Sequence, residues 1–160
     1  MHDEITAADH EVARRLYPSL RRFAAVVARS EHDPDDLVHD ALLNTLRTRR
    51  LADLDQPEAY LRRAIVNGAR NGRRDQWRRA TILARLRPND VQNVSYPSDL
   101  ADLERLAPHE RAILYMKIVE GYRYAEIADF LGISEDAARA RASRSAARLR
   151  LMLVEELRHG

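Results

Sequence analysis

Apolar residues recur along nearly the whole chain with the period of an α-helix, and no two alternating segments indicate a β-hairpin. The first helical pattern runs from about Ala8 to Ala28. A second helix is expected to begin at Pro34, because Asp33 is a good N-cap and proline suits the first helical position. Pro57 opens a third, longer pattern of the same kind. These periods predict an all-α fold.

The stretch RPNDVQNVSYPSD at residues 87–99 contains two prolines and several turn formers, which is typical of a linker. Fully extended, a linker of this length spans at most about 45 Å. We therefore predict two small helical domains, at residues 1–86 and 100–160, joined by this short connection. Four shorter helices are expected after the linker, near Asp99–Leu106, Pro108–Val119, Tyr124–Leu131 and Glu135–Leu157.

Residues 124–144, YAEIADFLGISEDAARARASR, combine a helix, a glycine corner and an arginine-rich helix. Gly132 can adopt the left-handed conformation that ends a helix, and Ser134 is a good N-cap for the next one. Small residues recur on one side of the second helix and arginines on the other, a pattern typical of a helix-turn-helix that reads the major groove. The alternative is a solvated amphipathic helix in a bundle. The candidate DNA contacts include Arg139, Ser143 and Arg144 on the outer face, with Arg141 at its border.

The third helix carries a second candidate nucleic-acid surface. Asn67 and Asn71 lie four residues apart in its interior, where asparagine is a poor helix former. Amide groups can bond base edges, and aromatic rings can stack on exposed bases. The alternative is that both amides satisfy a buried polar gap. The further candidates on this helix are Arg70, Arg74 and Trp77, with Tyr60 as a second stacking ring.

Composition and charge narrow the function classes. The net charge is only +2, but arginine is concentrated in residues 51–88 and 135–150, on either side of an acidic block. The absence of cysteine excludes disulfides, thiolate metal sites and a cysteine nucleophile. The chain begins without the apolar core of a signal peptide and contains no long apolar run, so we expect a cytoplasmic protein without membrane insertion.

A metal site is a remote alternative. Asp36 and His39 lie three residues apart and Asp40 follows, a spacing that some helical metal sites use. A metal site needs a second such pair, for which only a weak candidate at His10 is found, and no phosphate-binding glycine loop or nucleophile motif is present. We therefore expect no metal, no cofactor and no enzymatic activity, and a helical metalloenzyme stays only as the remote reading.

Four stretches together resemble the sigma-70 family of bacterial RNA polymerase sigma factors, in its compact extracytoplasmic-function (ECF, group 4) class. They occur in the family's order and spacing and cover most of the chain. The resemblance implies a region 2 domain followed by a region 4 helix-turn-helix domain. The stretches are DPDDLVHDALLNTLR, PEAYLRRAIVNGARN, RLAPHERAILYMKIVEGYRYAEIADFLGIS and SEDAARARASRSAARLR.

The resemblance also implies partners and roles in the first domain. Core RNA polymerase is expected to bind through its β′ clamp helices and its β flap, and promoter DNA is the second partner. An anti-sigma factor, common in this family, is left open. Asp36, His39 and Asp40 match the polymerase-docking positions, although glutamine and glutamate are more usual at the last two. Asn67 and Asn71 match residues that engage the −10 element, and the loop Arg49–Gln56 matches one that captures a flipped base.

In the second domain, the residues that match the family's −35-reading positions are Arg139, Ala140, Ser143 and Arg144. The run Asp136-Ala137-Ala138 departs from the usual small-Thr-Val pattern, and Ala146 replaces a further basic residue. Relative to the family pattern, these departures imply a weaker grip on the DNA phosphates than is typical, and they do not fix the strength of −35 binding. The competing reading is a stand-alone helix-turn-helix regulator, which would not need the polymerase-docking segment or the asparagine face.

Overall fold

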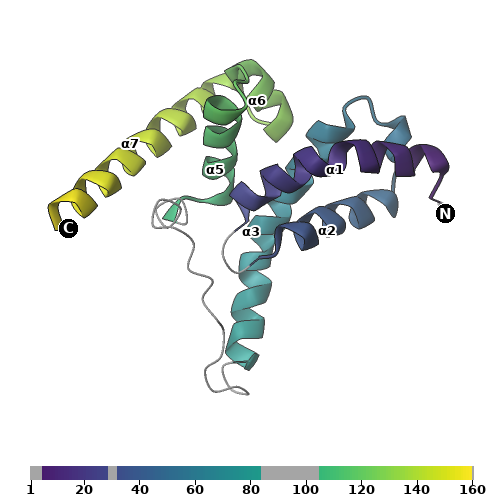
Figure 1. Cartoon of the computed structure of the whole chain (residues 1–160), viewed down its shortest axis with the longest axis horizontal. Helices are drawn as coiled ribbons and strands as arrows, with labels where there is room; N and C mark the ends of the chain where they lie inside the picture. The colour runs from purple at the N-terminus through teal and green to yellow at the C-terminus, as the bar shows by residue number, and fades with distance from the viewer. Residues whose placement is uncertain (1–4, 29–31, 84–104, 160) are drawn as a thin grey trace.

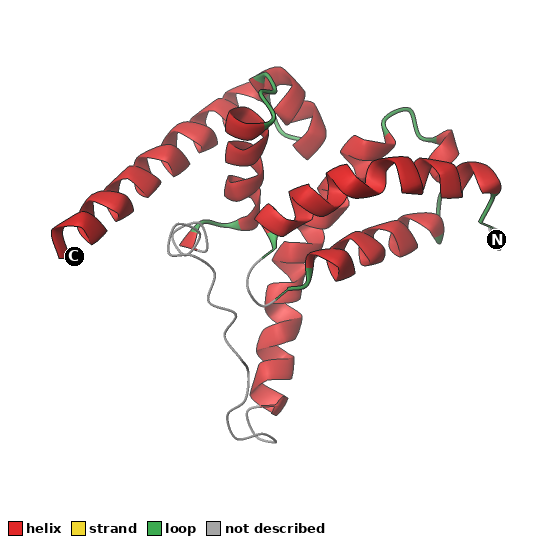
Figure 2. Cartoon of the chain, viewed as in Figure 1, coloured by secondary structure: helices red, strands yellow, loops and turns green. Residues whose placement is uncertain are grey.

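The computed structural model describes residues 5–28, 32–83 and 105–159, and for residues 72–83 it describes the backbone alone. All regular structure in these ranges is helical (Figure 2), which confirms the predicted all-α fold. None of the helices described is long and apolar enough to cross a lipid bilayer. The helices are α1 (Ala7–Val27), α2 (Pro34–Leu46), α3 (Pro57–Leu83), α5 (Pro108–Leu114), α6 (Tyr124–Leu131) and α7 (Glu135–His159).

Polar side chains define where the first two helices begin. At α1, Thr6 Oγ1 accepts a hydrogen bond from the backbone N–H of Asp9 (3.2 Å), and Asp9 Oδ2 accepts one from Thr6 N–H (3.1 Å). This reciprocal capping box satisfies two of the unpaired amides of the first turn. At α2, Asp33 caps the helix by accepting from Asp35 N–H (2.7 Å), and Pro34 takes the first position. The predicted start of α2 is thereby confirmed.

The first three helices pack against one another in pairs. Each contributes one apolar stripe to a common core, as the helical period of the sequence requires. A short 3₁₀ turn at Leu51–Asp53 lies between α2 and α3. The fully or almost fully buried side chains of this part include Leu20, Phe23, Ala24, Val27, Val38, Leu51, Leu61, Ile65 and Ala69.

The predicted helix, corner and helix are present around Gly132. This residue ends α6 in the left-handed conformation (φ 66°, ψ 37°), and Ile133 N–H bonds back to Ala128 O at 3.0 Å. Ser134 Oγ accepts from Ala137 N–H at 3.1 Å and so caps α7. The side chains of α7 that are buried beneath its outer face are Ala138, Ala142 and Ser145.

The helix predicted at Pro108–Val119 differs from the expected regular form. It is α-helical as α5 and then widens into a π-helical segment at Tyr115–Val119, closed by a hydrogen bond of 3.2 Å from Glu120 N–H to Tyr115 O. A π-helical turn holds more residues than an α-helical turn, and such turns are often found at functional sites. Within this segment, Ile118 and Val119 are 72% and 68% exposed.

The helices before and after residues 84–104 pack against each other. Helix α5 contacts α1 and α3, and α6 contacts α3, whereas α7 runs away from the first three helices (Figure 1). Across this junction, the ring of Phe23 in α1 lies 6.3 Å from that of Tyr115. One buried cluster includes residues of both groups. The predicted linker lies outside the described residues, so the domain boundaries remain a prediction.

Candidate nucleic-acid interface

The outer face of the first turns of α7 is open to solvent. Helix α7 packs on α5 and α6 through its stripe of small side chains. Because the face with the small side chains packs against these helices, the longer side chains on the opposite face of α7 point to solvent. Four of the five predicted −35 contacts lie on this exposed face: Arg139, Ala140, Ser143 and Arg144.

Arg141, the fifth candidate, is half-buried at the edge of this face. Burial lowers the pKa of His109 in α5, and the nearby charges of Arg141 and Arg70 lower it further. Arg141 therefore lies close enough to α5 to act on His109 electrostatically. Further along α7, Arg148 Nη1 pairs with Glu110 Oε1 at 3.1 Å, so α7 is tied to α5 by charge as well as by small residues.

The ring of Tyr124 has two cations close to it, beside the outer face of α7. The guanidinium carbon of Arg139 is 4.9 Å from its ring centroid, and Lys117 Nζ is 4.4 Å from it. Arg139 also pairs with Glu135 at 3.0 Å. These contacts orient the Arg139 fork before any ligand binds. Lys117 and Tyr124 were not predicted as neighbours of this face, because they come from elements outside α7.

The outer face of α3 is also exposed, and it carries Asn67, Arg70 and Asn71. Since both asparagines are exposed, they do not satisfy a buried polar gap, and that alternative is wrong. Tyr60, two turns before Asn67, is 37% exposed. Two candidates, Arg74 and Trp77, lie outside the residues whose side chains are described.

A buried carboxylate anchors the loop at residues 49–56. Asp9 of α1 is 1% exposed, and its Oδ1 accepts a hydrogen bond of 3.1 Å from Ala52 N–H. Burial would raise the pKa of Asp9, but the hydrogen bonds donated by Thr6 and Ala52 outweigh burial and lower it. Leu51 beside it is fully buried, while Arg49 lies over the Tyr60 ring at 5.9 Å. Asp9 thus holds the loop in place next to the exposed face of α3, a role that its position in the sequence did not predict.

A third exposed surface lies on α2 and carries opposite charge. Asp36, His39 and Asp40 are all exposed, and Leu43 on the next turn is 53% exposed. An apolar groove of about 250 Å³ between α1 and α2 is lined by His39 and Leu43, among others. Carboxylates repel a polyanion, so this combination of acidic and apolar groups suits a protein partner better than DNA.

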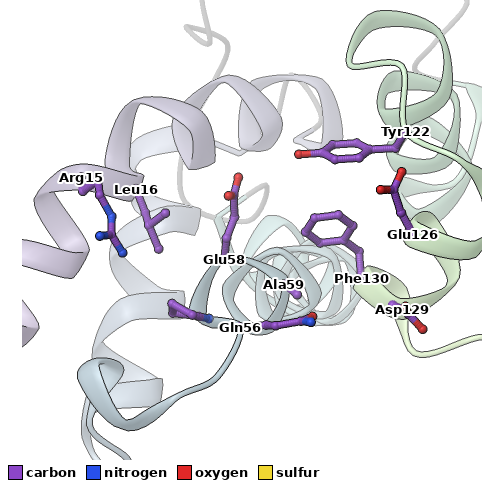
Figure 3. Close-up of a pocket in the computed structure, with 10 residues that line it drawn as sticks. Arg15, Leu16, Gln56, Glu58, Ala59, Tyr122, Glu126, Asp129 and Phe130 are labelled. Atoms are coloured by element: carbon purple, nitrogen blue, oxygen red, sulfur yellow. The ribbon is translucent and has the colours of Figure 1, made fainter.

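A cleft of about 520 Å³ separates the start of α3 from α6 (Figure 3). The rings of Tyr122 and Phe130 form one wall of it, facing Glu58 on the other. Glu126 and Asp129 also line the cleft. Nowhere in the described ranges do three or more His, Asp or Glu side chains gather as metal ligands, so Asp36, His39 and Asp40 do not form such a group.

Comparison with known proteins gives matches over most of the chain. Residues 12–79 match the family model "Sigma-70 region 2", and residues 103–149 match "Sigma-70, region 4". The ECF RNA polymerase sigma factor SigM of Mycobacterium tuberculosis is 28% identical over 152 residues, covering 89% of this chain and 76% of SigM. The RNA polymerase sigma factor CarQ of Myxococcus xanthus is 29% identical over 157 residues, covering 92% of this chain and 90% of CarQ.

The fold is also similar to that of a sigma factor among the solved structures. The sigma factor RpoE of Bartonella quintana, in complex with the anti-sigma factor NepR, aligns with a TM-score of 0.61 and 22% identity. The alignment covers 88% of this chain and 94% of the other. At this identity the likeness concerns the fold alone.

Proposed function

The chain belongs to the sigma-70 family of RNA polymerase sigma factors, in its ECF class, and we propose that it directs promoter-specific initiation by binding core RNA polymerase and contacting the −10 and −35 elements. The observation that carries this proposal is the separation of three exposed surfaces on three helices. Two of them carry arginine, asparagine and serine donors, and the third is acidic and apolar. A stand-alone repressor needs only the surface on α7.

The −35 element is assigned to the outer face of α7. Arg139, Ala140, Ser143 and Arg144 project together from the helix that follows the glycine corner, the geometry with which a recognition helix enters the major groove. Arginine can bond two acceptors of a guanine edge at once. Arg141, half-buried, is assigned to the border of this surface, near the DNA backbone.

The −10 element is assigned to α3 and to the loop before it. Asn67 and Asn71 present amides that can bond unpaired bases, and Arg70 between them can hold a phosphate. The anchoring of residues 49–56 by Asp9 suits a loop that must receive a base removed from the stack. Arg74 and Trp77 are assigned to the same surface on sequence grounds.

Core RNA polymerase is assigned to the acidic and apolar surface of α2, formed by Asp36, His39, Asp40 and Leu43. A protein of the anti-sigma kind is proposed as a further partner, because the similar fold in the solved complex is that of a sigma factor bound to one. The proposed role is that of an initiation factor and not of an enzyme. It places the protein with RNA polymerase in the cytoplasm.

Reconstitution with core RNA polymerase tests the proposal against the repressor alternative. The purified chain is expected to co-elute with core enzyme and to permit transcription from specific start sites. Asp36→Arg combined with Asp40→Arg is expected to abolish co-elution with the fold intact, whereas a charge reversal at the exposed Glu11 of α1 is the control. Tight binding to duplex DNA alone, with no effect of core enzyme, would favour the repressor.

A further inference from the structure

Arg62 is a buried cation at the junction between the helices before and after residues 84–104. Its side chain is 1% exposed. Nη2 pairs with Glu58 Oε1 of the same helix at 2.8 Å, and Nη1 pairs with Glu120 Oε2 at 2.6 Å. Glu120 follows the π-helical segment, 58 residues further along the chain. One guanidinium therefore links α3 directly to the helix-turn-helix part.

Aromatic rings from both sides enclose the same guanidinium. Its central carbon lies 4.7 Å from the ring centroid of Phe23 in α1, and 5.3 Å and 5.9 Å from those of Phe130 and Tyr122. Stacking of a desolvated cation on aromatic faces adds to the attraction of the carboxylates. Ser19 of α1 completes the group, because its Oγ accepts a hydrogen bond of 3.0 Å from Arg62 Nη2 and donates one of 2.6 Å to Glu58 Oε1. We call this group of residues the Arg62 cluster: Ser19, Phe23, Glu58, Arg62, Glu120, Tyr122 and Phe130.

Two more arginines cross the same junction by donating to carbonyl groups at helix ends. Arg63 Nη2 bonds to Asp129 O near the end of α6 (2.9 Å), and Arg111 Nη2 bonds to Val27 O at the end of α1 (2.6 Å). Carbonyl groups in the last turn lack partners within the helix and lie at its negative pole, so cations are favoured there. Besides the apolar contacts described above, three arginines thus bond across this junction.

The inference rests on the function proposed above, in which α3 reads the −10 element and α7 reads the −35 element. In the packed arrangement the two DNA-reading faces are too close together to contact both elements at once. Elements centred at −10 and −35 are about 25 base pairs apart, or about 85 Å along B-DNA. In the structure α3 contacts α6 and α6 contacts α7. Adjacent helix axes lie about 8–10 Å apart, so the two DNA-reading faces are separated by roughly 30 Å once offsets along the helices are added. Both elements cannot be contacted until the two groups separate.

We propose that the Arg62 cluster is a latch that holds the free protein closed, and that binding of core RNA polymerase opens it. An ion pair suits this task better than an apolar contact. Removing both ions from water is costly, and separation restores their hydration, which offsets much of the attraction lost. The latch is also part of the helix that reads the −10 element, since Arg62 precedes Asn67 by little more than one turn.

Distances within single molecules test the latch. The chain has no cysteine, so Ala25→Cys near the end of α1 and Ala147→Cys in α7, both exposed, provide two unique dye sites for energy-transfer measurements. The end of α1 contacts α5 through Arg111, and α5 contacts α7 through the pair of Glu110 and Arg148. The free protein is expected to show one dominant short-distance population. Glu120→Gln keeps the side-chain size but removes the charge that crosses the junction, and is expected to raise the ratio of open to closed molecules at least tenfold. Glu156→Gln, an exposed change of the same charge on α7, is the control.

A second variant covers the case in which Glu120→Gln perturbs folding, which circular dichroism would reveal. Arg63→Gln alters an exposed side chain, removes the bonds to α6, and is expected to open the protein by a smaller factor. Core RNA polymerase is expected to move the wild-type population to long distances. Because less of the binding energy is then used for opening, the Glu120→Gln protein is expected to bind core enzyme more tightly than wild type.

The possible results of these experiments distinguish a failure of the latch from a failure of the proposed function. A wild-type protein that is already open without polymerase would overturn the latch, and so would a folded Glu120→Gln protein with the distances of the control. If Glu120→Gln opens the protein but core enzyme neither binds it nor changes the wild-type distances, the latch stands and the proposed function is refuted.

Discussion

Replacing Gly132 by alanine is expected to destabilise the protein by about 2 kcal/mol, against about 1 kcal/mol for the same change at Gly121. Both glycines have left-handed backbones, with φ of 66° and 72°, so the cost of forcing an L side chain into this conformation is similar at the two sites. Their surroundings differ. A Cβ at Gly121 would meet nothing within 4 Å, whereas at Gly132 it would lie 2.9 Å from Arg63 Cζ.

The magnitude at Gly132 follows from what Arg63 would lose. Carbon atoms in contact are normally about 3.5–4.0 Å apart, so the guanidinium must move away. Arg63 is a flexible, exposed side chain, and its movement is cheap except for the hydrogen bond of 2.9 Å to Asp129 O. Such a bond contributes about 1 kcal/mol, which is the expected difference between the two glycine variants.

Urea unfolding followed by circular dichroism measures this difference, and repeating it in an Arg63→Ala background completes a double-mutant cycle. Without Arg63, Gly132→Ala should cost about as much as Gly121→Ala, near 1 kcal/mol. An equal cost of the two glycine changes in the wild-type background would refute the reasoning. So would an unchanged cost of Gly132→Ala when Arg63 is absent.

Three further changes probe the proposed surfaces and the anchored loop. Asn67→Ala with Asn71→Ala should preserve binding to core enzyme but reduce permanganate reactivity of −10 thymines, and unchanged reactivity would reject a role in opening. Arg144→Ala should weaken promoter binding of the reconstituted holoenzyme by about 1–3 kcal/mol, and an equal loss on DNA lacking the −35 element would exclude base reading. Asp9→Asn should lower stability at pH 7. The pKa of Asp9 in the folded protein lies below its usual 3.8, so the stabilisation by the carboxylate is complete above about pH 4 and is lost as the pH falls through the pKa of the folded protein. Acid-unfolding curves of the two proteins that stay parallel below about pH 4 would contradict this.

Helix starts and the glycine corner were predictable because the groups that form them are near neighbours in the sequence. Asp33 caps a helix whose amides lie two and three residues away, and Ser134 does the same for α7. The left-handed corner needs only a glycine at the end of an apolar period. The outward face of α7 was equally predictable, since the alternation of small and charged residues sets which side can pack.

The exposure of Asn67 and Asn71 depended on tertiary packing. Both sides of α3 carry residues that could lie in a core or in solvent. The helical period of the sequence alone therefore did not decide whether the two asparagines are buried or exposed. Packing of α1 and α2 against the side that bears Leu61 and Ile65 leaves the asparagines in water. The anchoring of the loop by Asp9 was hidden for a similar reason, because Ala52 lies 43 residues away.

The arginine-rich sequence specified by itself an all-helical chain with two basic surfaces, because periodicity and capping act over a few residues. It did not reveal that Arg62 and Arg111 are buried, since arginine is ordinarily a surface residue. A buried guanidinium is tolerable only where other segments supply carboxylates or carbonyl oxygens, and here these come from 58 and 84 residues away. The close packing of the helix-turn-helix on the first three helices is therefore a property of the folded chain, set by contacts that no local pattern encodes.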